Sequence, residues 1–215
     1  MLRRKFLGMA VGMYSAIALG LSACGVAAMT WVSLGLSLIG TLAPTIPGII
    51  NGFASLVGKT LTAAQQAKLV SIFNGVTDLL TQIKTAITNF EANPIGTILT
   101  EVKTLLTTLQ SSLNISAILN DLQISDTGTV AKITGIINTI LGLATTILTY
   151  LPVVNVTAAG ATTLSTAKIP GSVLKDSSPE AFATRLNYAL WTPSGNSDVD
   201  AAFASVKTVP VHVTK

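Results

Sequence analysis

The sequence predicts an all-α fold: an antiparallel bundle of long amphipathic helices with a small irregular C-terminal appendage. Between residues 62 and 151, apolar residues recur at steps of three and four, which is the spacing of one helix face. Short turn sequences separate these striped segments, and short turns favour antiparallel neighbours. Of the 215 residues, 49% are apolar and 10% are charged, so the chain can form a large core and is far from disordered in composition.

Residues 24–58 are apolar and belong to a charge-free stretch that runs from Phe6 to Gly58. Pro44 and Pro47 interrupt it, and we therefore expect no single long helix there. A helical face begins after Pro47, and Gly58 is expected to end that helix. It comprises Ile49, Ile50, Phe53, Leu56 and Val57.

Gly48 and Gly52 form a Gly-x-x-x-Gly pair in the same region. Residues four apart lie on one helix face, and two glycines there permit close contact with another helix. This pair predicts a helix contact and does not identify the partner helix.

The next helix is predicted to begin with a capping box, in which Thr62 and Gln65 satisfy free backbone N–H groups. A helix of thirty residues would be about 45 Å long at ~1.5 Å per residue. Asn93 and Pro94 are expected to supply the N-cap and first-turn proline of the helix that follows. The stripe comprises Leu69, Ile72, Phe73, Val76, Leu79, Leu80, Ile83, Ile87 and Phe90.

Two further stripes follow. One comprises Ile95, Ile98, Leu99, Val102, Leu105, Leu106, Leu109 and Leu113, with a short continuation through Ile118, Leu119 and Leu122. Residues 124–129 are predicted to form a turn. The other stripe comprises Val130, Ile133, Ile137, Ile140, Ala144, Ile147, Leu148 and Leu151, and it stops at Pro152.

The segment from Ile133 to Ala167 has no charge and has the composition of a membrane span. At ~100° per residue, however, its polar side chains fall in one arc and its apolar side chains in the other. A lipid-facing helix is usually apolar all round, so this pattern favours a soluble bundle over an integral membrane protein. The polar arc comprises Thr134, Asn138, Thr139, Thr145, Thr146 and Thr149.

The pattern changes after Val153. Residues 153–176 are expected to form a loop with extended pieces, followed by a helix that starts at Ser177-Ser178-Pro179-Glu180 and turns Phe182, Leu186, Ala189 and Leu190 inward. A short helix over Val199–Val206 and an edge strand over Thr208–Thr214 complete the appendage. The expected organisation is therefore a signal (1–23), an anchored apolar segment (24–58), a bundle core (59–152) and a C-terminal appendage (153–215).

The N-terminus has the three parts of a secretory signal: basic residues, a short apolar run from Met9 to Leu21, and small residues before a cleavage point. Leu21-Ser22-Ala23-Cys24 resembles the bacterial lipobox. That resemblance implies that Cys24 receives a diacylglyceryl group, becomes the first mature residue and holds the protein at a membrane. Gly25 resembles the non-aspartate residues that favour the outer membrane in enteric-type sorting. The alternative is a buried thiol in an uncleaved anchor helix.

Arg3-Arg4-Lys5-Phe6-Leu7 also resembles the twin-arginine export motif, in which two arginines precede an apolar pair. The resemblance implies export in a folded state. An ordinary basic region of the general secretory route is the alternative interpretation.

The charge balance argues against nucleic-acid binding. The formal charge is +4, but three of the 13 basic residues precede Cys24, so ten remain against nine acidic residues. A nucleic-acid surface needs basic residues gathered into a patch. The remaining lysines are spread singly along the sequence, and we expect them on solvated helix faces.

The sequence predicts no catalytic, cofactor or metal site. One cysteine excludes a disulfide or a thiolate cluster, and the only histidine, His212, lies on the predicted edge strand. The motifs for a nucleophile elbow, a phosphate loop, a dinucleotide fold and a zinc protease are absent. Surface or capping roles are expected for the carboxylates considered as acid and base pairs, namely Glu91, Glu101, Asp198 and Asp200.

We therefore expect a non-enzymatic lipoprotein of the bacterial cell envelope, at the outer membrane or the periplasmic face. It would act as a structural or interaction module, through an envelope protein partner or through self-association of its helix faces. The alternatives are a small integral membrane protein that perturbs bilayers and a carrier of an apolar ligand. Packing in the core or at its rim is expected for four aromatic residues, with a membrane interface as the alternative: Trp31, Tyr150, Tyr188 and Trp191.

Overall fold

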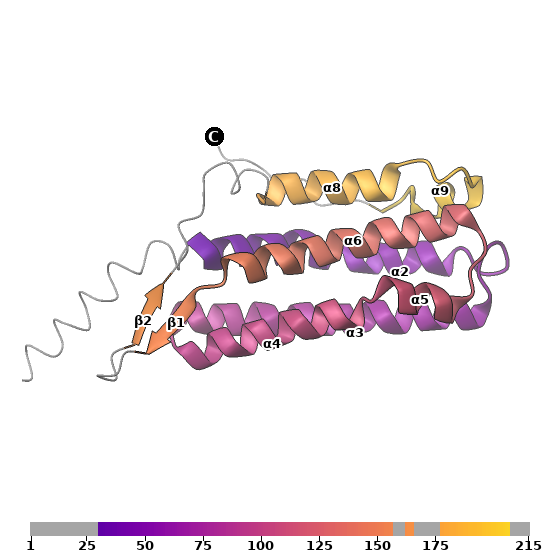
Figure 1. Ribbon diagram of the computed structural model, residues 1–215. Helices are drawn as coiled ribbons and strands as arrows, with labels where there is room; N and C mark the ends of the chain where they lie inside the picture. Colours follow the sequence, from indigo (N-terminus) through magenta and orange to yellow (C-terminus); the bar gives the residue numbers. More distant parts are fainter. Residues whose placement is uncertain (1–29, 157–161, 166–176, 207–215) are drawn as a thin grey trace, which may run out of the picture.

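Long helices lie side by side along one axis in the computed structural model (Figure 1), which describes residues 30–156, 162–165 and 177–206. The predicted all-α bundle is confirmed. Consecutive long helices run in opposite directions and are joined at the two ends of the bundle. After helical residues 30–42, the elements are η1 (Ala43–Thr45), α2 (Ile46–Ala54), α3 (Ala63–Ala92), α4 (Gly96–Ser112), α5 (Ile115–Leu122), α6 (Thr127–Tyr150), β1 (Val153–Val156), β2 (Thr162–Ser165), α8 (Pro179–Trp191) and α9 (Ser197–Phe203).

The two prolines near the N-terminus do not end the helix, so the expectation of a break there was wrong. Residues Thr30–Ala54 form one continuous helical run in which Pro44 sits in the single 3-10 turn, η1, and Pro47 in the first turn of α2. A first-turn proline has the right φ and needs no N–H partner. The Thr45 hydroxyl donates to the carbonyl of Thr41, which adds a hydrogen bond where the backbone pattern changes.

The turn between α2 and α3 also differs from the prediction. The helix ends at Ala54, and Gly58 lies in the following turn with a φ of +78°, a left-handed conformation that favours glycine. The predicted capping box at the start of α3 is confirmed: Thr62 accepts from the Gln65 N–H, and the Gln65 side chain accepts from the Thr62 N–H. The helix runs for 30 residues, Ala63–Ala92.

Asn93 and Pro94 do not begin α4, contrary to the prediction. Asn93 is the C-cap of α3, and Ile95 is the N-cap of α4 without a side-chain cap. Pro94 disfavours helical geometry at Asn93, which accounts for the end of α3 at this point. The predicted turn at 124–129 is shorter than expected, because Asp126 caps α6 and the helix begins at Thr127.

The striped faces meet in one core. The buried residues of α6 recur at steps of three and four along the helix, which confirms the apolar arc predicted for it. Large aliphatic side chains contribute about 1.5–3 kcal/mol each when buried, so these stripes hold the helices together. The core includes Trp31, Leu38, Ile46, Phe53, Leu69, Phe73, Leu80, Phe90, Val102, Leu109, Ile136, Ile140 and Ile147.

Threonine hydroxyls cover the outer faces of the helices and bond to their own backbone. Thr81 donates to the Thr77 carbonyl, and Thr104 donates to the Thr100 carbonyl, each at 2.9 Å. Such bonds to the residue four positions back satisfy the hydroxyl without a partner helix. The pattern recurs at Thr85, Thr88, Thr107, Thr108, Thr149 and Thr184.

The C-terminal residues that the structure describes are less irregular than predicted. Strands β1 and β2 pair antiparallel at one end of the bundle, α8 lies along α6, and α9 packs on α2. Phe182, Leu190 and Phe203 belong to the same core as the bundle. The predicted appendage is therefore continuous with the bundle, while the strand predicted at Thr208–Thr214 lies outside the described residues.

The Gly48 and Gly52 pair makes the predicted close contact, and its partner is α9. A Cβ at Gly52 would lie 2.7 Å from the Phe203 ring, and one at Gly48 would lie 3.3 Å from Val206. The Phe203 ring packs edge-on against Phe53 with centroids 5.1 Å apart. The absence of two side chains on α2 therefore allows α9 to dock.

Two helical runs in the described residues are long and apolar enough to cross a membrane by length and composition: Thr30–Ala54 and Thr127–Tyr150. In each, 44% of the most apolar window is buried inside the bundle. Core helices of soluble proteins pass the same test, so these runs are weak evidence for membrane association.

Candidate functional site

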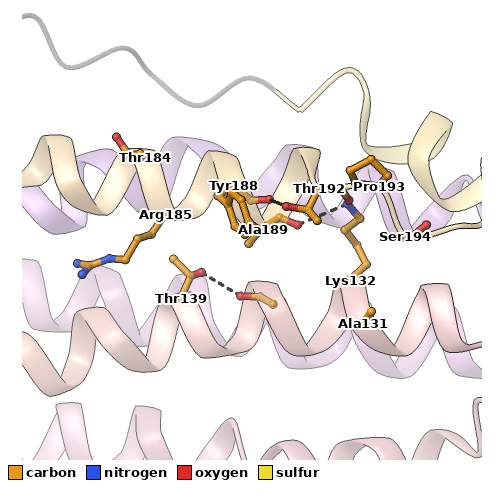
Figure 2. A pocket seen from close by; sticks show the side chains of 11 residues that line it. Ala131, Lys132, Thr139, Thr184, Arg185, Tyr188, Ala189, Thr192, Pro193 and Ser194 are labelled. Carbon is orange, nitrogen blue, oxygen red and sulfur yellow. Dashed lines mark hydrogen bonds between the residues drawn. The ribbon is translucent and has the colours of Figure 1, made fainter.

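A groove lies between α6 and α8 (Figure 2). It has a volume of about 510 Å³ and runs along the outside of the bundle. From α6 it is lined by Ala131, Lys132, Gly135 and Thr139, and from α8 and the turn after it by Thr184, Arg185, Tyr188, Ala189, Thr192, Pro193 and Ser194. We call it the α6–α8 groove.

Small residues shape the floor of the groove. Gly135 on α6 faces Ala189 on α8, and a Cβ at Gly135 would lie 3.5 Å from the Ala189 Cβ. The Thr139 hydroxyl donates to the Gly135 carbonyl at 2.9 Å, which turns its polar atom toward its own helix. The two helices therefore come close without side chains that fill the space above them.

A second hollow of about 410 Å³ adjoins the groove further along α6. It shares Thr139 and Arg185 with the α6–α8 groove, and it is otherwise lined by Asn138, Gly142, Thr145 and Thr146. Four of the lining residues, Asn138, Thr139, Thr145 and Thr146, belong to the polar arc that the sequence predicted for α6. The apolar groove thus passes at Arg185 into a hollow lined by hydroxyl and amide groups.

Lys132 closes the other end of the groove. Its side chain is 2% exposed, and its ammonium group donates to the carbonyl oxygens of Leu190 at 2.7 Å and Thr192 at 2.8 Å, with a longer contact to Ala189 at 3.4 Å. The nearest carboxylate oxygen, from Asp200, lies at 3.8 Å. Burial lowers the pKa of Lys132, and the Asp200 charge partly offsets this.

A polar cluster behind Lys132 fixes the turn between α8 and α9. Asp126, the N-cap of α6, accepts from the Thr129 N–H and hydroxyl and from the Asn196 amide at 3.0 Å. Asn196 in turn caps α9. These bonds from Thr129 and Asn196 lower the pKa of Asp126. Asp200 accepts from the Ser194 N–H at 3.0 Å, so its carboxylate is also held by the turn.

Arg185 and Tyr188 form the outer wall on α8. Both are exposed, Tyr188 to 73%, and Figure 2 shows the Arg185 side chain extending from α8 toward the edge of the groove. No carboxylate of the described residues forms an ion pair with Arg185. The guanidinium is therefore an available cation at the junction of the two hollows.

The residues singled out from the sequence are placed as follows. Arg3, Arg4, Phe6, Leu7, Leu21, Ser22, Ala23, Cys24 and His212 lie outside the described residues. Glu91 and Glu101 are exposed on α3 and α4. Asp198 pairs with Lys59 at 3.2 Å, whereas Asp200 turns to Ser194 and Lys132.

Sequence reasoning missed Lys132 and misplaced two aromatic residues. Lys132 was assigned to a solvated face, yet it lies on the buried stripe of α6 with Thr129, Ile133 and Ile136. The sequence carried a signal for this, because the spacing of Lys132 from the apolar residues of α6 places it on the same helix face as they are. A lysine on that face is either buried with them or interrupts the apolar face. Tyr188 and Trp191, expected at the core or its rim, are exposed on α8.

No group of three or more His, Cys, Asp and Glu side chains able to hold a metal ion occurs within the part of the chain that the structure describes. The described residues thus define an all-α bundle whose clearest site is an open groove. Comparison with protein-family models, curated proteins and solved structures finds no match to this chain.

Proposed function

We propose that the chain is the precursor of a bacterial envelope lipoprotein whose mature part, starting at Cys24, is a non-enzymatic helical module tethered by lipid. The lipobox-like sequence before Cys24 is one support. The other is that apolar side chains of the helical residues 30–42, which follow Cys24, pack in the core of the bundle. This second observation carries the proposal, because apolar side chains that pack inside the bundle are not also needed for contact with lipid.

The helical residues 30–42 are a core element of the bundle. Trp31 is 1% exposed, and its indole N–H donates to the carbonyl of Ile147 on α6 at 3.3 Å. The Trp31 ring packs edge-on against Phe90 of α3 with centroids 5.7 Å apart. Because this helix packs between α3 and α6, part of its apolar surface is already covered, which supports attachment to the membrane by another group.

Acyl chains on Cys24 would supply that attachment. Two or more chains give stable anchoring, whereas one gives only marginal binding. Thr30 is six positions after Cys24, and six residue steps reach at most about 20 Å in any conformation. The tether would therefore hold the end of the bundle that contains Thr30 and the α3–α4 turn close to the bilayer surface.

The module would act through its exposed helix faces, by binding an envelope protein partner or another copy of itself. The exposed face of α8 supports this part of the proposal, because Trp191 is 56% exposed and lies one turn from Tyr188. Tyrosine, tryptophan and arginine are the residues that most often contribute strongly at protein interfaces. The outer membrane or the periplasmic face is the proposed location.

Fatty-acid labelling tests the tether. Cells that express the full chain are grown with an alkyne fatty acid, and the protein is analysed by gel and by intact mass. Wild type should incorporate label that resists neutral hydroxylamine, because its acyl chains would be oxygen esters of a glyceryl group on the Cys24 sulfur and not thioesters, and it should begin at Cys24. Cys24→Ser should incorporate no label and accumulate as the larger precursor.

A matched variant separates directed lipidation from general thiol acylation. Cys24→Ser combined with Ser71→Cys returns a thiol to the chain at an exposed position of α3. It should remain unlabelled, because the signal that directs lipidation is at the N-terminus. A wild-type protein that keeps Met1 and a free thiol would overturn the proposal.

A further inference from the structure

We infer that the α6–α8 groove binds an anionic single-chain amphiphile, with its alkyl chain between α6 and α8 and its carboxylate or phosphate head at Arg185. This goes beyond the lipid tether and does not depend on it, because no residue of the groove belongs to the N-terminal signal. Four features of the groove carry the inference: its size, its apolar floor and, among the described residues, one lining cation without an ion pair and no acidic lining.

The groove has the dimensions of a small-molecule site. Its volume of about 510 Å³ lies within the roughly 300–1,000 Å³ of such sites. From Ala131 to Thr139 it follows eight residues of α6, or about 12 Å. Ala131, Gly135, Ala189 and the Tyr188 ring offer carbon surface along this length, and an alkyl chain would bury that surface together with its own.

The head group cannot be held by Lys132. Its ammonium group already donates to backbone carbonyls of α8 and the turn, and the Asp200 carboxylate faces it. Arg185 has no such partner in the described residues. Its planar guanidinium presents paired N–H donors that match a carboxylate or a phosphate.

The surroundings of Arg185 are complementary to an anion. Among the residues that the structure describes, no aspartate or glutamate lines either the groove or the adjoining hollow. Beyond Arg185, the amide of Asn138 and the hydroxyl of Thr146 line the adjoining hollow. The alkyl chain of a bound amphiphile would therefore lie on carbon surface, and its anionic head would lie at Arg185 with neutral polar groups beyond it.

The test measures binding of octanoate, labelled with carbon-13 at the carboxylate, to the full chain in phosphatidylcholine nanodiscs. The carboxylate resonance is followed during titration, and octyl phosphate and octanol are compared. Partition into the bilayer is common to all variants, so differences between variants report the groove. Arg185→Gln should weaken octanoate or octyl phosphate binding about tenfold or more, as expected for loss of a charged hydrogen-bond partner. It should leave octanol binding unchanged.

Two matched controls accompany the variants. Lys84→Gln removes an exposed cation from α3 and should bind octanoate as wild type does. Gly135→Leu fills the groove floor and should abolish binding, whereas Gly75→Leu, at an exposed α3 position with no atom within 4 Å of its Cβ, should not. Circular dichroism checks that each variant is folded. If Gly135→Leu does not fold, Ala189→Leu replaces it, because this change fills the groove from α8.

Whichever of octanoate and octyl phosphate binds the wild-type protein more tightly identifies the preferred head group, carboxylate or phosphate. Equal binding of both anions to wild type, Arg185→Gln and the filled-groove variant would show partition into the bilayer alone and would overturn the inference. Because Cys24 is unchanged in every sample, this failure is distinct from a failure of the lipid-tether proposal.

Discussion

The ammonium nitrogen of Lys132 on α6 lies 2.7 Å from the carbonyl oxygen of Leu190 near the C-terminus of α8. The last carbonyls of a helix have no partner within the helix, and a cation there is favoured by the helix dipole. One buried side chain thus satisfies the end of α8 and links α6 to α8 through two residues, Lys132 and Leu190, that are 58 positions apart in sequence. This contact sets the closed end of the α6–α8 groove.

Replacement of Lys132 by methionine should destabilise the protein by about 2 kcal/mol, because buried carbonyls of α8 lose their donor. Chemical denaturation followed by circular dichroism gives the free energy of unfolding. The matched change Lys84→Met on the exposed face of α3 should stay within about 0.5 kcal/mol of wild type. Equal denaturation midpoints for the two variants would contradict the structural role of Lys132.

Acid should weaken the corner between α6 and α9 through Asp126. Its folded pKa is lowered from the ordinary value of 3.8, so between these two values the unfolded chain binds more protons than the folded chain. The stabilisation by this carboxylate is therefore complete above about pH 5 and is lost as the pH falls through the lowered folded pKa. Denaturation of wild type and Asp126→Asn between pH 2 and 7, on the order of one pH unit per step, measures this difference.

The difference in stability between the two proteins should be largest near neutral pH and should shrink toward pH 2, because asparagine has no charge to lose. A difference that is constant across the range would show that the Asp126 charge does not contribute.

Gly52→Ala should destabilise the fold by about 1–3 kcal/mol, since overpacking forces neighbours to move. The new methyl group would lie 2.7 Å from the Phe203 ring. Gly40→Ala is the matched control, because no atom lies within 4 Å of its Cβ and it occupies the same helical run. That control should be neutral or stabilising by about 0.5–1 kcal/mol, as expected for glycine replacement within a helix. Similar thermal midpoints for the two variants would contradict the α2–α9 contact.

Tryptophan fluorescence distinguishes the packed bundle from an inserted helix. In Trp191→Phe, the remaining Trp31 lies inside the bundle and should not be quenched by brominated lipid chains in reconstituted vesicles. In Trp31→Phe, the exposed Trp191 should be quenched readily by aqueous acrylamide. Quenching of Trp31 by brominated chains would place residues 30–42 in the bilayer and would favour the integral membrane alternative.

The sequence predicted the long helices because their signals are local. The capping box at Thr62 and the stripes of α3, α4 and α6 depend only on residues a few positions apart, and the structure confirms them. The prolines were misread because a local rule does not reveal that one 3-10 turn at Pro44 can keep the helix continuous.

The groove could not be predicted, because it depends on contacts between segments far apart in the chain. Gly135 meets Ala189, and Lys132 meets Leu190, only after α8 folds back along α6. The sequence showed the polar arc of α6, but it did not show that α8 packs beside this helix. Cys24 and the signal residues remain predictions, since they lie outside the described residues.

The threonine hydroxyls on α3 and α4 bond to their own helices, and few charged groups stand between them. The groups on these faces are neutral hydroxyls, so their hydration does not change with pH. Salt has little effect there, because few charges are present for it to screen. These faces would therefore stay wetted in the same way through swings of acidity and salinity that alter highly charged proteins. A protein displayed outside the cytoplasm, where the cell does not buffer its surroundings, would keep its solubility without adjusting its charge.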